Sequence, residues 1–106
     1  MAVSVFISQP MNELTEEEIN EARVNAMKEI KSILGEDRDV QILEPLDPVL
    51  KTKPVSEKDH LWCLGKSLQT MAIADHVYFA DGWKNKRGCV IEHQCAQLYG
   101  LNIIKE

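Results

Sequence analysis

Short apolar runs alternate with helical patterns along the whole of this 106-residue chain. Four runs rich in strand-forming residues predict β-strands at residues 3–7, 40–43, 76–80 and 101–104. Strands that alternate with helices form a parallel sheet, because each helix carries the chain back to the edge where the next strand begins. The sequence therefore predicts a single α/β domain spanning residues 1–106, with helices on both faces of the sheet.

Three helices are expected between these strands. The first begins at Thr15, which forms a capping-box pattern with Glu18, and it ends at about Gly35. Asp59 is the expected cap of the second helix, and the third spans residues 88–99. The apolar residues expected to face the core are Ile19, Ala26, Ile30 and Ile33, then Leu61, Leu64, Leu68, Met71 and Ala72, and finally Ile91, Cys95 and Leu98.

Charge and hydropathy exclude two classes of partner. A net charge of −5 disfavours a broad electrostatic contact with a nucleic acid polymer. No apolar run approaches the ~18 residues that a membrane span needs, so no membrane partner is expected. Three cysteines without close pairing, together with a first strand that lacks a basic leader, predict a cytoplasmic protein.

In an open parallel sheet, ligands bind outside the carboxyl ends of the strands. That rule selects residues 8–10, 44–47 and 81–83, together with the start of the last helix. The loop at 44–58 holds three prolines and no periodicity, and a loop of this length in a small domain is often functional.

The segment from Gly82 to Glu92 carries the most chemical information. Gly88 stands at a helix start, where a missing side chain lets a ligand approach the backbone and where free N–H groups favour an anion. Glu92 follows one turn later on the same helical face, beneath such a ligand. The alternative is that Glu92 is a solvated helix residue, and the spacing alone leaves both interpretations open.

Three motifs resemble the nucleoside 2-deoxyribosyltransferase-like proteins. They are Val-Phe-Ile-Ser-Gln-Pro-Met at 5–11, Ala-Asp-His-Val-Tyr at 74–78 leading into Gly-Trp at 82–83, and Arg-Gly-Cys-Val-Ile-Glu at 87–92 with Ala96 and Gly100 behind it. The resemblance covers nearly the whole chain and is closest to a small branch found in phages and in bacteria that carry prophages. It implies a flavodoxin-like or Rossmann-like three-layer sandwich with sheet order 2-1-3-4, and a site for a small-molecule nucleoside or nucleotide.

The same resemblance implies roles for particular residues. Glu92 matches the family's nucleophile, which attacks the anomeric carbon of a deoxyribose. Asp75 matches an aspartate of the same site, which holds the sugar or helps the base to leave. The loop after the second strand touches the base, and here it would contribute Glu44, Pro45 or Asp47.

Two departures from the family pattern change the expected substrate. Phe6 stands where the active transferases carry a tyrosine, and Lys86 stands where they carry an aspartate that grips the 5′ end of the sugar. Lys86 cannot accept that hydrogen bond, whereas Lys86 and Arg87 together suit a 5′-phosphate. The expected activity is therefore cleavage or transfer of the N-glycosidic bond of a deoxynucleoside or its 5′-monophosphate. No metal or organic cofactor is implied.

Two further functions stay open at this point. One is a non-catalytic nucleotide-binding module or sensor on the same fold, and the other is a plain interaction protein. Relatives assemble around their sites, and Trp62 and Tyr99 are candidate contact residues, so a homo-oligomer is expected. The remaining candidates for substrate binding are Ser8, Gln9, Pro10, Arg23, Asp81, Gly82, Trp83 and Gly88.

Several of these residues have an equally ordinary interpretation. Arg23 interrupts an apolar stripe, so it either snorkels at the core edge or reaches a phosphate. Trp83 either stacks on a base or covers the core. Cys89 and His93 have a spacing that suits zinc, but no other pair completes four ligands. His60 is expected to be structural or exposed.

Overall fold

The computed structural model describes residues 2–10, 15–43 and 56–106. Over these residues it shows a four-stranded sheet of order β2-β1-β3-β4. Both neighbours of β1 run parallel to it, as does β4 beside β3. The strands are β1 (Val3–Ser8), β2 (Val40–Leu43), β3 (His76–Phe79) and β4 (Ile103–Lys105). This confirms the predicted α/β, Rossmann-like fold and its strand order.

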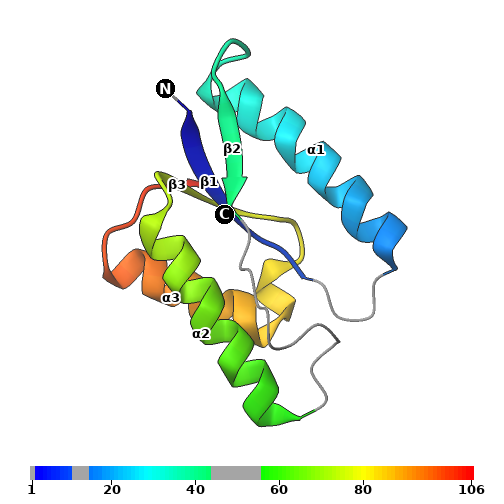
Figure 1. Ribbon diagram of the computed structural model, residues 1–106, viewed down its shortest axis with the longest axis vertical. Helices are drawn as coiled ribbons and strands as arrows, with labels where there is room; N and C mark the ends of the chain where they lie inside the picture. The colour runs from blue at the N-terminus through cyan, green and yellow to red at the C-terminus, as the bar shows by residue number, and fades with distance from the viewer. Residues whose placement is uncertain (1, 11–14, 44–55) are drawn as a thin grey trace.

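The helices cover the two faces of the sheet unequally. They are α1 (Glu16–Leu34), α2 (Glu57–Ile73) and α3 (Arg87–Leu98), with a short 3-10 helix, η1 (Trp83–Asn85), before α3. One face packs against α1, and the other packs against α2 and α3 (Figure 1). Because side chains alternate along a strand, Val5 joins the α1 cluster while its neighbour Phe6 joins the cluster beneath α2 and α3.

The two long helices start at capped residues, one expected and one not. The Oγ1 atom of Thr15 accepts a hydrogen bond from the Glu18 backbone N–H, and the Glu18 carboxylate accepts one from Thr15, so the predicted capping box is confirmed. Ser56, and not Asp59, caps α2, because the Ser56 Oγ accepts from the Asp59 backbone N–H. The predicted cap at Asp59 was therefore wrong by three residues. Ser and Asp are both common N-cap residues, so the sequence alone does not distinguish Ser56 from Asp59.

The expected core stripe of α3 was only partly right, because Cys95 packs against the core cluster beneath α2 and α3 but Leu98 does not. The buried residues of this helix are Cys89, Glu92 and Ala96, whereas Leu98 is 83% exposed. Small side chains such as Cys89 and Ala96 allow a helix to pack closely against a sheet. The core prediction also failed for Ile33, Leu61 and Ala72, which lie at the edges of the buried helix faces and are exposed.

The last strand begins later than the apolar pattern indicates. Gly100 adopts a left-handed backbone conformation with φ of 68°, and the Leu101 N–H bonds back to the Ala96 carbonyl. The chain thus leaves α3 through a helix-ending turn and pairs with β3 only from Ile103 onward. Among the described residues, no helix is both long and apolar enough to cross a bilayer.

Candidate active site

The candidate site lies at the carboxyl end of β1, where the first turns of α2 and α3 converge. Ser8 is the last residue of β1 and is buried on the same face of the sheet as Phe6. Its Oγ donates a hydrogen bond of 2.8 Å to Oε1 of Glu92, on α3. A strand end and a helix therefore hold this carboxyl group from two sides.

Glu92 is a buried carboxyl group with an altered proton affinity. The residue is only 6% exposed. Burial raises the pKa of Glu92 from 4.5 to about 7, and the hydrogen bond from Ser8 opposes the rise. Near neutral pH, comparable fractions of Glu92 are thus charged and protonated. The interpretation of Glu92 as a solvated helix residue is excluded.

A hollow of about 180 Å³ opens beside Glu92. This volume lies below the roughly 300 Å³ at which pockets for drug-sized ligands begin, so the hollow suits a group of the size of one sugar ring. The described residues that line it come from the end of β1, the inner face of α2 and the start of α3. They are Gln9, Pro10, His60, Cys63, Leu64, Ser67, Lys86, Gly88, Cys89 and Glu92.

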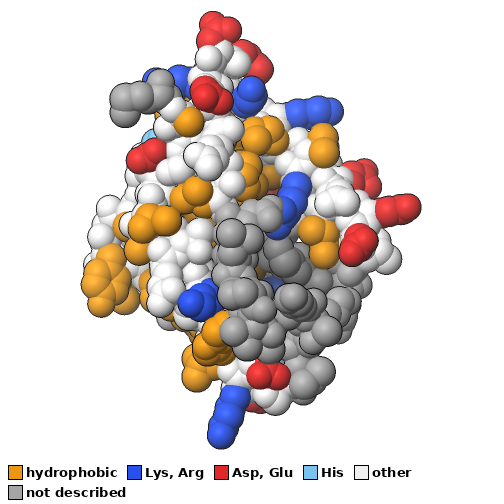
Figure 2. All heavy atoms as spheres, in the orientation of Figure 1, with side chains coloured by type: hydrophobic (Ala, Val, Ile, Leu, Met, Phe, Trp, Pro, Cys, Tyr) orange, Lys and Arg blue, Asp and Glu red, His pale blue; other side chains and the backbone are white. Residues whose placement is uncertain are grey.

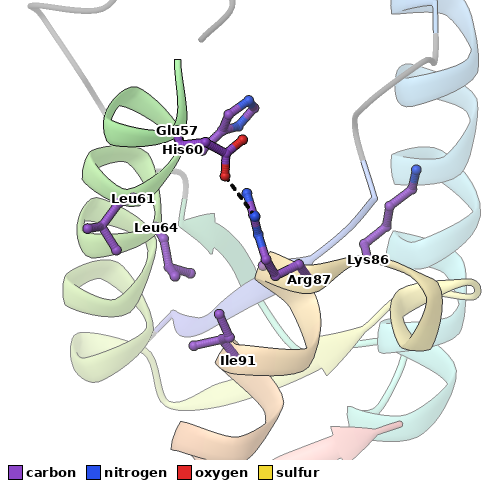
Figure 3. A pocket seen from close by; sticks show the side chains of 8 residues that line it. Glu57, His60, Leu61, Leu64, Lys86, Arg87 and Ile91 are labelled. Carbon is purple, nitrogen blue, oxygen red and sulfur yellow. Dashed lines mark ion pairs between the residues drawn. The ribbon is translucent and has the colours of Figure 1, made fainter. Parts of the chain in front are cut away.

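A larger hollow of about 610 Å³ adjoins the first, between the starts of α2 and α3. Figure 3 shows Leu61 and Leu64 on one wall, Ile91 below them, and Arg87 reaching across to Glu57. The Arg87 guanidinium and the Glu57 carboxylate form an ion pair at 2.8 Å, and both side chains are largely exposed. Ion pairs this exposed add little stability, so Arg87 is easily redirected to another anion.

The start of α3 carries positive charge where helices usually carry none. Lys86 is the N-cap, Arg87 is the first helical residue, and the first turn has no acidic residue and no side-chain cap. A Cβ atom built on Gly88 would meet nothing within 4 Å, so the backbone there is open on that side. The helix dipole and both cations thus act in the same direction, toward an anion.

Asp75 does not lie in this site. Its Oδ2 accepts hydrogen bonds from the backbone N–H and the hydroxyl of Ser4, at the start of β1. Both bonds lower the pKa of the exposed Asp75 carboxyl, and the bond from the Ser4 backbone has the larger effect. Ser4 and Ser8 are four residues apart in an extended strand, which separates them by about 13 Å. Because Asp75 precedes β3, it belongs to the amino edge of the sheet, and the expectation that it shares a site with Glu92 was wrong.

The structure separates the other candidates into two groups. Gln9, Pro10, Lys86 and Gly88 lie around Glu92, and Arg87 lines the adjoining hollow. The residues placed elsewhere are Trp83, Arg23, Asp81 and Gly82, and Asp47 lies outside the described residues.

Trp83 serves the core. Its ring stacks on His93 with centroids 4.1 Å apart, and it lies 5.4 Å from the ring of Phe79. His93 also contacts the Glu106 carboxylate. The side chain of Trp83 is therefore committed to packing, and the interpretation that it covers the core fits better than base stacking.

Among residues 2–10, 15–43 and 56–106, no group of three metal-ligating side chains occurs.

Arg23 is half-buried on α1 and does not line the hollow that holds Glu92. Asp81 follows β3, and its exposed carboxylate pairs with Lys105 at 3.2 Å. Gly82 adopts a left-handed conformation with φ of 87° to begin η1, which favours glycine at that position. Asp47, like Glu44 and Pro45, lies outside the described residues.

Sequence reasoning missed the contribution of α2. His60, Cys63 and Ser67 line the hollow beside Glu92, although the sequence marks α2 only by its apolar repeat. Their spacing of three and four places them on one helical face, and that periodicity is the signal that identifies them once the packing of α2 against α3 is known.

Comparison of the chain with models of known families, with curated proteins and with solved structures finds no match.

Proposed function

We propose that this protein cleaves the N-glycosidic bond of a deoxynucleoside 5′-monophosphate, as a member of the nucleoside 2-deoxyribosyltransferase-like family. The observation that carries the proposal is the Glu92 carboxyl, buried beside a pentose-sized hollow at the carboxyl end of a parallel sheet. Among the described residues no cation pairs with Glu92. Burial of an unpaired carboxylate costs folding free energy, and such costs concentrate at functional sites.

The chemistry assigns one covalent role to Glu92. Its carboxylate oxygen attacks C1′ of the sugar, the C1′–N bond breaks, and the bonding electron pair leaves with the base. The base takes up one proton, either from water or from His60 in the same hollow. Water then attacks C1′, the C1′–O bond to Glu92 breaks, and the proton lost by the water goes to His60 or to solvent. This step regenerates the carboxylate and releases the free sugar phosphate. If another base attacks instead of water, the same cycle transfers the sugar.

The charged residues beside the hollow support a 5′-phosphate as the second recognition element. Lys86 borders both hollows, and Arg87 reaches into the larger one. A sugar seated at Glu92 would direct its phosphate toward these cations and the open backbone at Gly88. The charge at Lys86 favours a nucleotide over an uncharged nucleoside.

Free-base release tests the proposal. The protein is incubated with each of the four common deoxynucleoside 5′-monophosphates, and chromatography measures the free base. Wild type is expected to release base, while Glu92→Gln and Glu92→Ala release at least about 100-fold less. Glu21→Gln, an exposed change on α1, is the matched control and is expected to keep the wild-type rate. Equal release by wild type and Glu92→Gln would overturn the role of Glu92.

A nucleotide-binding module is the second candidate function. The observation in its favour is that Glu92 is the only carboxylate among the described residues lining its hollow, since Asp75 lies elsewhere. A binder is identified by nucleotide-dependent thermal stabilisation without base release. If neither stabilisation nor release occurs, the chain is an interaction protein on an α/β fold.

We also propose that the protein assembles into a homo-oligomer. Figure 2 shows apolar side chains at several separate places on this face, some of them over α2 and α3. Ile73, Leu98 and Tyr99 are more than 70% exposed, at the carboxyl ends of these two helices. Large apolar side chains exposed together are typical of contact surfaces. Analytical ultracentrifugation is expected to show a dimer or larger species, and a monomer at every concentration would contradict this expectation.

A further inference from the structure

A third hollow, of about 410 Å³, lies on the α1 side of the sheet, next to the end of β1. It shares Gln9, Pro10 and Lys86 with the hollow that holds Glu92. The two spaces therefore meet at the end of β1, one on each face of the sheet. A ligand whose sugar occupies the smaller space can extend past Gln9 into the larger one.

The inner wall of this third hollow is built from small side chains. Ala22 and Ala26 come from α1, Ala80 directly follows β3, and Gly82 begins the next turn. Methyl groups leave a shallow apolar surface where larger residues would fill the space. A volume of about 410 Å³ is within the range of pockets for small ligands, and it accommodates a planar nucleobase.

Gln9 contributes an unsatisfied acceptor at the junction. The residue is 9% exposed, and its Nε2 donates a hydrogen bond of 3.2 Å to the Ile19 carbonyl. That bond fixes the orientation of the amide, because the opposite orientation would set two oxygens against each other. The buried Oε1 has no hydrogen-bond donor among the described residues. A ligand N–H that reaches this oxygen removes the cost of leaving it unpaired.

The rim of the third hollow carries two carboxylates, which accept hydrogen bonds, as does the Gln9 Oε1 atom. Glu29 and Asp81 line it, and Lys105 holds both carboxylates at 3.0 and 3.2 Å. The Tyr78 hydroxyl donates to Glu29 at 2.8 Å and is therefore not available to donate to a ligand. The carboxylates on this rim disfavour a phosphate even though Lys86 also lines the hollow, whereas Arg87 attracts one in the hollow between α2 and α3. The charges thus orient a nucleotide with its phosphate toward α3 and its base toward α1.

We propose that the hollow beside α1 is the base subsite and that the Gln9 Oε1 atom selects bases carrying an amino group. The chemistry recognised is a neutral N–H donor, such as the exocyclic amine of adenine or cytosine. A base with a carbonyl oxygen in that place leaves Oε1 unpaired and adds a second acceptor facing it. This inference rests on the proposed function, because it assumes that the sugar lies at Glu92.

Matched pairs of nucleotides test the selection. Deoxyadenosine and deoxyinosine monophosphates differ by an amine against a carbonyl, as do deoxycytidine and deoxyuridine monophosphates. Wild type is expected to prefer the amino member of the matching pair by about 10-fold or more, in kcat/KM or in Kd. Gln9→Met keeps the side-chain length without the amide and is expected to reduce the preference to about 2-fold. Gln97→Met, exposed on α3, is the control.

A sugar hydroxyl is the other possible donor to Gln9. A 2′,3′-dideoxyadenosine 5′-monophosphate arm separates the two sources. If the base amine is the donor, removing the 3′ hydroxyl leaves the effect of Gln9→Met on the adenine-to-hypoxanthine ratio unchanged. If Gln9→Met no longer changes this ratio when the 3′ hydroxyl is removed, the Gln9 Oε1 atom accepts its hydrogen bond from the sugar hydroxyl, and the proposal is overturned.

A steric variant tests the location without relying on Gln9. Ala22→Leu adds bulk to the inner wall of the third hollow, away from Glu92. It is expected to weaken nucleotide binding about 10-fold or more and to leave the binding of 2-deoxyribose 5-phosphate within 2-fold. The exposed Ala72→Leu is the control. Equal effects of Ala22→Leu on nucleotide and sugar phosphate would place the base elsewhere.

These outcomes separate the base subsite from the proposed function. Base release that depends on Glu92, together with no amino preference or a preference that Gln9→Met retains, overturns the role of Gln9 alone. The absence of both release and binding for all tested nucleotides overturns the two proposals together. If Gln9→Met unfolds, the wild-type ratios and Ala22→Leu still decide the question.

Discussion

At Glu92 a single side chain links folding stability to chemistry. The carboxyl is held in the folded protein with a pKa of about 7, against 4.5 when exposed. A nucleophile must be ionised, so this raised pKa lowers the reactive fraction at neutral pH while preserving the basicity of the oxygen that attacks. Activity that depends on the carboxylate is expected to rise with pH through about 7.

The free energy of unfolding should fall as pH rises, whereas activity should rise. Between pH 4.5 and 7 the folded state binds a proton at Glu92 that the unfolded chain has lost, so the free energy of unfolding falls as pH rises. The loss amounts to about 3 kcal/mol by pH 8. Urea denaturation of wild type and Glu92→Gln at pH 5 and pH 8 measures it. The two proteins should differ in their pH dependence by about this amount, and parallel curves would mean that Glu92 titrates normally.

The hydrogen bond from Ser8 limits how far burial raises the pKa of Glu92. Its hydroxyl donates to the Glu92 carboxylate, and this bond lowers the pKa that burial raises. Ser8→Ala is therefore expected to move the pKa of Glu92 further above 7 and to shift the rising limb of any activity profile to higher pH. Carbon-detected NMR titration of the glutamate carboxyls measures the pKa directly. Ser67→Ala changes the same hollow without removing this bond and should leave the titration unmoved.

Between elements, the ion pair of Glu57 and Arg87 joins the first turn of α2 to the first turn of α3. If Arg87 serves a phosphate, Glu57 competes with the ligand for the same guanidinium. Glu57→Gln is expected to tighten the binding of a nucleotide 5′-monophosphate about two- to fivefold and to leave nucleoside binding unchanged. Isothermal titration calorimetry measures both, with exposed Glu36→Gln as control. Unchanged or weaker nucleotide binding would remove Arg87 from the phosphate site.

The elements also differ in how well their sequence predicts them. The capping box at Thr15 is local, so α1 could be placed from three or four residues. The orientation of α3 could not, because two faces carry apolar residues and the sheet selects the one with Cys89 and Ala96. Glu92 belongs to that selected face, so its burial follows from tertiary packing and not from its own spacing.

At the scale of the molecule, the alternation of strands and helices predicted the parallel sheet, whereas the strand order 2-1-3-4 came from the family resemblance. With the strands parallel, the carboxyl end of β1 lies beside those of β2 and β3, and residues after β1 and β3 join one region. The rule for parallel sheets predicted that Ser8, Gln9 and Gly88 lie at this edge, and in the structure they lie beside Glu92. It also exposes the error at Asp75, because a residue just before a strand lies at the opposite edge.

Trapping the sugar on the protein tests the central claim most directly. The protein is mixed with the deoxynucleotide that it cleaves fastest, quenched in acid during turnover, digested and analysed by mass spectrometry. We expect 2-deoxyribose 5-phosphate linked through C1′ to the carboxylate of Glu92, on the peptide containing that residue, and no such adduct in Glu92→Gln. Base release at the wild-type rate by Glu92→Gln, or an ester on a different residue, would contradict it.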